Sequence, residues 1–401
     1  MWAKSEAYKN NYLQTELKHI TPTTINGIVN KEVENRDGAL STVSNYMPSN
    51  CFYNRSPLAY GLWALPELMK QIGSDDFEVQ YKALSSLAEY VVNPLHAQRA
   101  IRQFQVVRRC QNIFFRIRMK YEKSKFQTAE RILEIFYNVA KHMSGVEAIV
   151  HSNRLMDQFY AIVRDREEHM LKISKILSLL TERISAAIYL LDNYNVMQKF
   201  ADIWRQDICA PYYPIDLWLH FQHILQQAPD KAIELGLFEI LHTRIRGRVF
   251  QFHRCDLKCF ALLLRCEEGQ KRFLNVDGVR EMYELLVDPS KQLDSYENVI
   301  LTLMNGVLAK PVLWRCREFT NLPIIIMRLA EISKEYNMQL YCLQLLRELG
   351  EMPCIKRFIQ ENCLNTLNNI SCIGAMNEKL REELIYWLQR EIYHTSELKK
   401  K

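Results

Sequence analysis

The chain is poor in the two residues that most often interrupt regular structure. It has 12 glycines and 12 prolines among 401 residues, about 3% of each, against an average of roughly 7% and 5%. With so few residues that favour tight turns, a protein built from many short strands is not expected. The sequence also lacks GxGxxG and GxxxxGKS/T. These glycine-rich loops approach phosphate closely, so the two nucleotide-binding classes that use them are not expected.

Long apolar runs are missing as well. Two of the longest, Leu322–Met327 and Ala186–Leu191, are far shorter than the about 20 apolar residues of a membrane-spanning helix. The first ten residues lack the apolar segment of a signal peptide. We therefore expect a protein of the cytoplasm, without membrane insertion. The 11 cysteines are odd in number and form no CxxC pair, which favours reduced and mostly buried thiols.

The overall composition is that of a folded protein. Hydrophobic residues make up 48% of the chain and charged residues 24%, which excludes disorder of the chain as a whole. The net charge of +6 is mild and does not by itself indicate a nucleic-acid partner.

Composition and periodicity divide the chain into three parts. Residues 1–56 are rich in Asn, Thr, Ser and Tyr and show no sustained apolar period, so we predict a flexible N-terminal extension. Residues 57–370 have apolar residues at spacings of three and four, the period of packed helices. The polar break at Asp75-Asp76 can cap the helix that follows it. Residues 371–401 are predicted to form a C-terminal capping helix and a basic tail, because a stack of repeats needs a last helix that covers its core.

An internal repeat runs through the helical part. Apolar anchors recur about every 42 residues, at Leu155, Val196, Leu237, Val279, Leu322 and Leu364. Armadillo and HEAT repeats have periods of about 40–47 residues, with two or three helices each. We therefore predict an all-α fold, an armadillo/HEAT-type α-solenoid that forms a right-handed superhelix of about seven helical repeats.

A second set of positions follows the apolar block of each long helix and is polar in nearly every case. The set is Glu89, Asn138, Glu182, Gln226, Cys266, Asn305 and Glu348. Asn138 and Asn305 lie in armadillo-like segments. In armadillo repeats, such an Asn projects into the concave groove and binds the backbone of an extended ligand. We predict that all of the set except Cys266 form a partner-binding groove. Alternatively, these residues simply end the apolar stripe of an amphipathic helix.

Positive charge is concentrated between residues 97 and 125, where nine Lys or Arg occur with a single Glu. We predict a basic docking patch for an acidic partner: a protein surface, a tubulin-like polymer or, least expected of these, nucleic acid. The patch comprises Arg99, Arg102, Arg108, Arg109, Arg116, Arg118, Lys120 and Lys123. Alternatively, the charges form a solvated helical face, with the interleaved Ile113, Phe114 and Phe115 in the core.

Residues that could carry chemistry form no recognisable catalytic pattern. The candidates for metal binding are His220, His223, His242, His253, Cys255 and Cys259. Neighbouring repeats could bring some of them to one ion, but HExxH and CxxC are missing, and packing is the simpler interpretation. GxSxG is missing too. We expect a protein that is not an enzyme, with no catalytic residue, metal, cofactor or small-molecule substrate.

The segment Ser56–Ile101 resembles part of a known family. The matching short motifs are Ala59-Tyr60-Gly61, Ala64-Leu65-Pro66 with Leu68, Ser74 with Asp76, Lys82-Ala83-Leu84 with Leu87, and Pro94 with Ala100-Ile101. They resemble the opening armadillo repeat of the radial spoke head family once named for the rhabdoid tumour deletion region. Tyr46-Met47-Pro48 is similar to that family's N-terminal approach.

This resemblance implies a non-enzymatic structural subunit of the radial spokes, in the axoneme of motile cilia and flagella. Radial spokes transmit mechanical signals between the central pair and the outer doublets. The implied partners are other radial spoke or axonemal proteins. The family is not known for catalytic residues, so the resemblance assigns none to this chain.

Two other functions stay open from the sequence. A soluble armadillo adaptor, such as a cargo-binding transport receptor, would use the same groove. Against it, Asn occupies only two of the groove positions, and the six Trp do not recur at the repeat period. A nucleic-acid-binding solenoid would use the basic patch, and its affinity would fall steeply with salt.

Overall fold

The computed structural model describes residues 64–118, 123–165, 167–206, 214–246, 254–287 and 293–390. Throughout these ranges the regular structure is helical, without a strand, and the helices pack against their neighbours. The fold is therefore all-α and solenoid-like, as the apolar period predicts. The handedness of the superhelix and the number of repeats stay predictions. The predicted extension, residues 1–56, lies outside the described residues.

The chain divides into two compact units, Met1–Leu180 and Thr181–Lys401. The helices of the first unit are α4 (Ala64–Gln71), α5 (Phe77–Tyr90), α6 (Pro94–Phe104), α7 (Val106–Arg118), α8 (Lys123–Ala140), α9 (Met143–Val150), α10 (Asn153–Asp165) and α11 (Met170–Thr181), which ends at the boundary. The first helices of the second unit are α12 (Ile184–Asn193), α13 (Val196–Gln206), α14 (Ile215–Gln227), α15 (Pro229–Glu234), α16 (Leu237–Arg246), α17 (Arg254–Leu263), α18 (Glu267–Asn275) and α19 (Gly278–Val287). They are followed by α20 (Leu293–Gly306), α21 (Lys310–Arg315), the 3-10 helix η3 (Cys316–Glu318), α22 (Leu322–Ile332), α23 (Tyr336–Leu349), α24 (Pro353–Asn362), α25 (Leu364–Asn369) and α26 (Ala375–Gln389).

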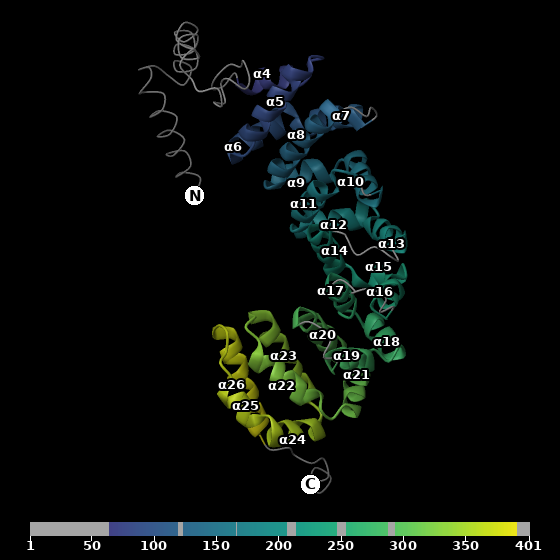
Figure 1. Cartoon of the computed structure of the whole chain (residues 1–401), viewed down its shortest axis with the longest axis vertical. Helices are drawn as coiled ribbons and strands as arrows, with labels where there is room; N and C mark the ends of the chain where they lie inside the picture. The colour runs from purple at the N-terminus through teal and green to yellow at the C-terminus, as the bar shows by residue number, and fades with distance from the viewer. Residues whose placement is uncertain are drawn as a thin grey trace, which may run out of the picture. The chain divides into compact units, whose positions relative to one another are not determined.

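Three kinds of helix alternate along the chain. We call them ladder helices (α5, α8, α11, α14, α17, α20, α23, α26), bridging helices (α6, α9, α12, α15, α18, α21, α24) and anchor helices (α7, α10, α13, α16, α19, α22, α25). In the first unit α5 contacts α8, and in the second unit α14, α17, α20, α23 and α26 contact one another in turn. Bridging helices likewise contact each other, α15 with α18 and α18 with α21. Figure 1 shows α20, α23 and α26 side by side in the second unit. Packing each helix against its counterparts is how a solenoid builds a continuous core.

The predicted apolar anchors mark the beginnings of the anchor helices. Each lies within two residues of the first residue of α10, α13, α16, α19, α22 or α25. Of the six anchors, only Leu364 is more than 1% exposed. The anchors recur because five of these six helices begin by burying an apolar side chain.

Side-chain caps fix where α5 and α6 begin. The carboxylate of Asp76 accepts hydrogen bonds at Oδ1 from the backbone N–H of Glu78 at 2.8 Å and of the next residue at 3.4 Å, which confirms the predicted cap. Asn93 caps α6 in the same way, since its Oδ1 accepts from the N–H of Leu95 at 2.9 Å. Pro94 follows at the first helical position, where its missing N–H costs no helical bond.

Two glycines let a bridging helix cross the end of a ladder helix at close range. Gly145 is the third residue of α9 and Gly269 the third residue of α18. A Cβ atom built on either would lie 2.0 Å from a backbone carbonyl oxygen of the preceding ladder helix, that of Val139 or Leu263. Only glycine has no atom there, so these positions fix how tightly the two helices can approach.

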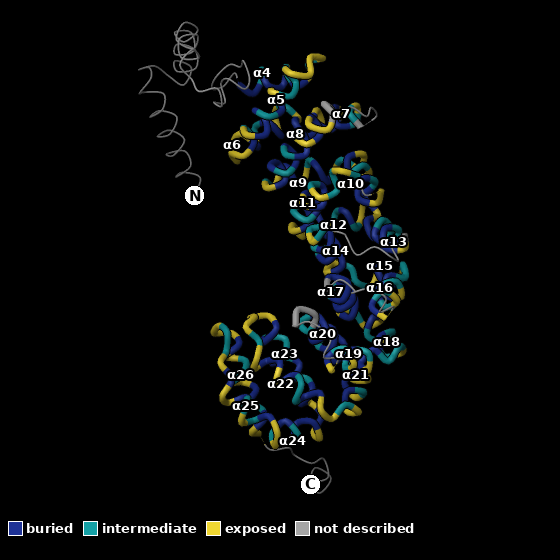
Figure 2. Tube along the Cα trace, viewed as in Figure 1, coloured by how far each residue is buried: buried dark blue, intermediate teal, exposed yellow. Residues whose placement is uncertain are grey.

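Buried residues line the sides of the helices that face one another (Figure 2). In the second unit, Trp204 of α13 and Trp218 of α14 stack with ring centroids 5.9 Å apart, and both are at most 1% exposed. At the end of the described chain, α26 buries Leu384 and Leu388 completely and contacts α23. Its exposed side carries Tyr386, and the predicted capping role of this helix stays a prediction.

No described helix is by itself long and apolar enough to cross a membrane. One bent pair, Tyr296–Gly306 with Lys310–Glu318, has the length and apolar composition of a membrane-spanning helix only when its two segments are taken together. They are joined across a 120° bend. Both segments pack within the second unit, α20 against α17 and α23, and α21 against α18.

Candidate partner-binding surfaces

The predicted basic patch lies on α6 and α7 of the first unit. Arg102, Arg108 and Arg116 are exposed. Arg109 is also exposed, but its Nη1 donates a hydrogen bond to the carbonyl oxygen of Met69 at 3.2 Å. Its side chain therefore also fastens α7 to α4.

The other side of α7 belongs to the core. Ile113 is 5% exposed and Phe114 is 2% exposed. Phe115 is half-buried, and the guanidinium carbon of Arg154 lies 3.8 Å from its ring centroid. The interpretation that places Ile113, Phe114 and Phe115 in the core is confirmed for the first two, whereas Phe115 is only partly buried. The arginines occupy the opposite face, as the 3.6-residue period requires.

Part of the predicted patch lies outside the described residues. Arg118 ends α7 and Lys123 begins α8, but neither side chain is described, nor is any part of Lys120. Arg99 is half-buried, and its Nε donates to Gln103 Oε1 at 3.2 Å.

The exposed arginines have no acidic neighbours along the chain. No Asp or Glu occurs between Tyr90 and Tyr121. Arg102, Arg108 and Arg116 form no ion pair with any part of the chain that the structure describes. Within the described residues their charges are therefore not neutralised by an ion pair, and the planar guanidinium matches a carboxylate with two parallel hydrogen bonds. The outer face of α6 and α7 can therefore recognise an acidic surface.

The two asparagines of the predicted groove bond to neighbouring ladder helices. Asn138 of α8 is 6% exposed, and its Nδ2 donates to the carbonyl oxygen of Ala88 in α5 at 3.0 Å. Asn305 of α20 is also 6% exposed, and its Nδ2 donates to the carbonyl oxygen of Ala261 in α17 at 2.8 Å. Each amide thus satisfies a carbonyl in the last turn of a helix, where the helix itself provides few partners.

The remaining groove candidates are less enclosed. Glu89, Glu182 and Gln226 are exposed, and Glu348 is half-buried. All of them lie at or just beyond the C-terminal end of a ladder helix. The prediction that the six residues bind a partner is not decided by these positions, and it stays a prediction.

A buried amide that the sequence analysis did not select joins α22, α23 and the start of α26. Gln339 of α23 is completely buried. Its Nε2 donates to the carbonyl oxygens of Ala330 at 3.3 Å and Ser371 at 2.9 Å. Its Oε1 accepts from the N–H of Ile373 at 2.7 Å and from Asn377 Nδ2 at 3.2 Å. The signal in the sequence was a Gln inside an apolar stripe, and its four bonds explain why it is tolerated there.

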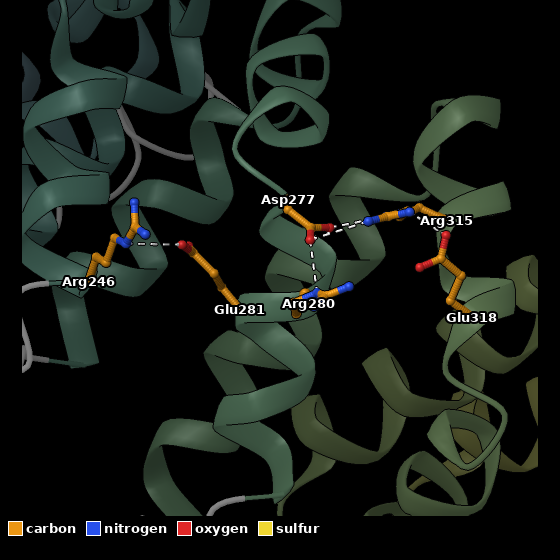
Figure 3. Close-up of polar contacts among 6 residues, drawn as sticks. All are labelled: Arg246, Asp277, Arg280, Glu281, Arg315 and Glu318. Atoms are coloured by element: carbon orange, nitrogen blue, oxygen red, sulfur yellow. Dashed lines mark hydrogen bonds and ion pairs between the residues drawn. The ribbon is translucent and has the colours of Figure 1, made fainter.

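Ion pairs connect successive helices in the second unit (Figure 3). Asp277 lies just before α19. Its Oδ1 is 3.1 Å from Nε of Arg315 in α21, and its Oδ2 is 2.9 Å from Nε of Arg280 in α19. The hydrogen bond from Arg315 is the main reason that the pKa of Asp277 lies below its usual value. Arg315 also pairs with Glu318. These side chains are partly exposed, so each pair contributes roughly 0–1 kcal/mol.

The candidate metal ligands have other roles. His220 is completely buried, and its Nδ1 lies 2.9 Å from Thr181 Oγ1, with His223 Nδ1 at 3.3 Å from the same oxygen. His242 Nε2 lies 2.7 Å from Glu281 Oε2. Over the described ranges, no group of three or more His, Cys, Asp or Glu is arranged to hold a metal ion. His253 lies outside those ranges, and Cys255 and Cys259 are buried in α17.

Comparison with known proteins gives matches among solved structures alone. No protein-family model matches the chain, and no curated protein matches it. One similar solved structure is the crystal structure of an engineered protein, with a TM-score of 0.48 and 11% identity, covering 82% of this chain and 89% of that one. A second, also an engineered protein, has a TM-score of 0.32 and 14% identity over 72% of this chain and 96% of that one.

Proposed function

We propose that this chain is a non-enzymatic structural subunit of the axonemal radial spoke in motile cilia or flagella. Its solenoid surface would hold partner proteins in fixed geometry. Two features support the proposal. The segment Ser56–Ile101 resembles the opening repeat of a radial spoke head family. The all-α, solenoid-like packing offers an extended surface of the kind that repeat proteins use for binding.

The single observation that carries the binding role is the set of exposed arginines on α6 and α7. Arg102, Arg108 and Arg116 are exposed and lie in a stretch without Asp or Glu. An acidic protein surface complements such a set. Charges of this kind mainly raise the rate of association and fix the orientation of the partner. At physiological salt their attraction is screened beyond about 8 Å, so the partner has to sit directly on this face.

The proposal is tested by fractionating motile, flagellated cells that express the tagged chain. After mild detergent and washing, we expect the tag to stay on the axonemes, and to be lost from axonemes of spoke-deficient cells. The combined substitution of Arg102→Glu, Arg108→Glu and Arg116→Glu should release the chain, because it reverses the charge of the docking face.

A matched control variant is Arg317→Glu, Arg328→Glu and Arg357→Glu. These arginines are exposed and form no ion pair within the described part of the second unit. This variant should stay on the axonemes. Full release of the unmodified chain into the detergent-soluble pool would contradict the spoke assignment and favour the cytosolic adaptor.

A further inference from the structure

Two aliphatic side chains are exposed where α6 begins, beside the exposed arginines. Val92 is 57% exposed and Leu95 is 65% exposed. A single exposed leucine is ordinary on a protein surface. Here, however, Leu95, Arg99 and Arg102 stand at positions i, i+4 and i+7 of one helix, so they share one face. An apolar contact point and positive charge are therefore combined on a single surface.

This face is held in a fixed position. The rings of Tyr90 and His96 stack with centroids 4.2 Å apart and planes 11° apart, which ties the end of α5 to the first turn of α6. On the inner side of α6, Ala97 and Ala100 are completely buried, and the helix contacts α4, α7 and α9. A surface that is rigid before binding loses little entropy when a partner arrives.

We infer that the outer face of α6, formed by Val92, Leu95, Arg99 and Arg102, docks an acidic segment of a partner protein that carries an apolar residue among its carboxylates. The inference rests on the proposed docking role of the basic surface, and it adds the chemistry of the partner. The carboxylates would pair with the guanidinium groups. The apolar residue would cover Leu95 and Val92 and remove them from water.

The aliphatic side chains distinguish this partner from a nucleic acid. Single-stranded nucleic acid is bound through basic grooves with aromatic side chains on which bases stack. Leucine and valine offer no such stacking surface, and phosphate groups gain nothing from contact with them. A polypeptide supplies both carboxylates and an apolar side chain, so it uses all of the face.

The test measures binding of two fluorescent peptides to the full chain by anisotropy. The first peptide has one Leu between runs of Glu, and in the second that Leu is replaced by Ser. We expect the unmodified chain to bind the Leu peptide about tenfold more tightly, the effect of burying one leucine. Leu95→Ser should reduce this preference strongly and leave binding of the Ser peptide unchanged. Arg102→Glu should weaken binding of both peptides.

The chain offers a matched control for the leucine. Ile184 begins the bridging helix α12 in the second unit and is 61% exposed, so Ile184→Ser removes a comparable aliphatic side chain elsewhere. It should leave both affinities unchanged. Val92→Ser provides an independent variant of the docking face and should reduce the preference for the Leu peptide. Circular dichroism of each variant shows whether the helices are retained.

Several outcomes would overturn the inference. The inference fails if neither peptide binds, or if both peptides bind with equal affinity. It also fails if Leu95→Ser and Val92→Ser leave the preference for the Leu peptide unchanged. A concentration-dependent dimer that Leu95→Ser dissociates would assign the face to a second copy instead.

The failure of the inference is distinguishable from that of the proposed function. If axonemal retention needs the arginines but not Leu95, only the inference fails. If the peptides bind as expected but the chain leaves the axoneme, only the spoke assignment fails.

Discussion

The substitution Gly269→Ala tests whether close helix crossings hold the repeats together. Gly269 lies where α18 crosses the end of α17, and an added Cβ would lie 2.0 Å from the carbonyl oxygen and 2.9 Å from the carbonyl carbon of Leu263. Its third neighbour would be Cδ1 of Ile233, at 3.1 Å. Two of these three atoms are backbone, so they cannot move aside as the end of a flexible side chain can.

The sign of the stability change separates two effects. In a helix without this contact, replacing Gly by Ala would stabilise the fold by about 0.5–1 kcal/mol, because Gly loses more conformational freedom on folding. Forcing an atom into a packed site typically costs about 1–3 kcal/mol, and occasionally more. Since backbone atoms of α17 have to move, the cost lies near the upper end of this range, and after the gain is subtracted we expect a net loss of about 2 kcal/mol.

The assay is urea unfolding followed by far-ultraviolet circular dichroism. Because repeat arrays can unfold in stages, hydrogen exchange of α17 and α18 should locate the loss, and protection should fall there first. Gly73→Ala is the control, since a Cβ at Gly73 would lie 3.4 Å from the carbonyl oxygen of Lys70, an ordinary contact. It should change stability by less than about 0.5 kcal/mol. If Gly269→Ala is as stable as the unmodified chain, the close crossing is not a constraint.

Four further predictions concern buried groups and ion pairs. Asn138→Ala should lower the free energy of unfolding by about 1–3 kcal/mol, because a carbonyl in the last turn of α5 loses its amide partner; an unchanged urea midpoint would contradict this. Asp277→Asn removes the charge that Arg315 pairs with and should cost less than about 1 kcal/mol, an effect that high salt should erase. Burial raises the pKa of Cys110 from 9.0 to about 12. In mildly alkaline buffer a thiol reagent should therefore modify the exposed Cys354 long before it modifies Cys110. Mass spectrometry of the peptides measures the order of modification. Because the unfolded thiol ionises near 9.0 and the folded one only near 12, stability should also fall as pH rises above 9.0.

The sequence predicts the repeating parts of the fold well, for a physical reason. Most anchor helices bury the apolar residue with which they begin, so the anchors at Val196, Leu237 and Leu322 coincide with the first residue of α13, α16 and α22. The polar positions after each apolar block lie at the ends of ladder helices, because there the stripe that faces the core stops. Both patterns are local, and a single sequence contains them.

What the sequence could not predict depends on contacts between distant segments. The amides of Asn138 and Asn305 bond to helices 50 and 44 residues earlier in the chain, and nothing in the local pattern shows which carbonyl lies opposite. The exposure of Leu95 was likewise unpredictable, since an apolar residue in an amphipathic helix is normally assigned to the buried face. Charge alone found the arginines of α6 and α7, but it did not reveal that Arg109 also bonds to Met69 in α4.

The most direct test of the central claim is cryo-electron tomography of axonemes from motile cells that lack this chain. The proposed role in the radial spoke predicts averaged axonemes in which density is missing from the spokes, while the outer doublets and the central pair stay intact. Re-expression of the unmodified chain should restore that density, and the variant with Arg102→Glu, Arg108→Glu and Arg116→Glu should not. Complete spokes in cells without the chain would contradict the account.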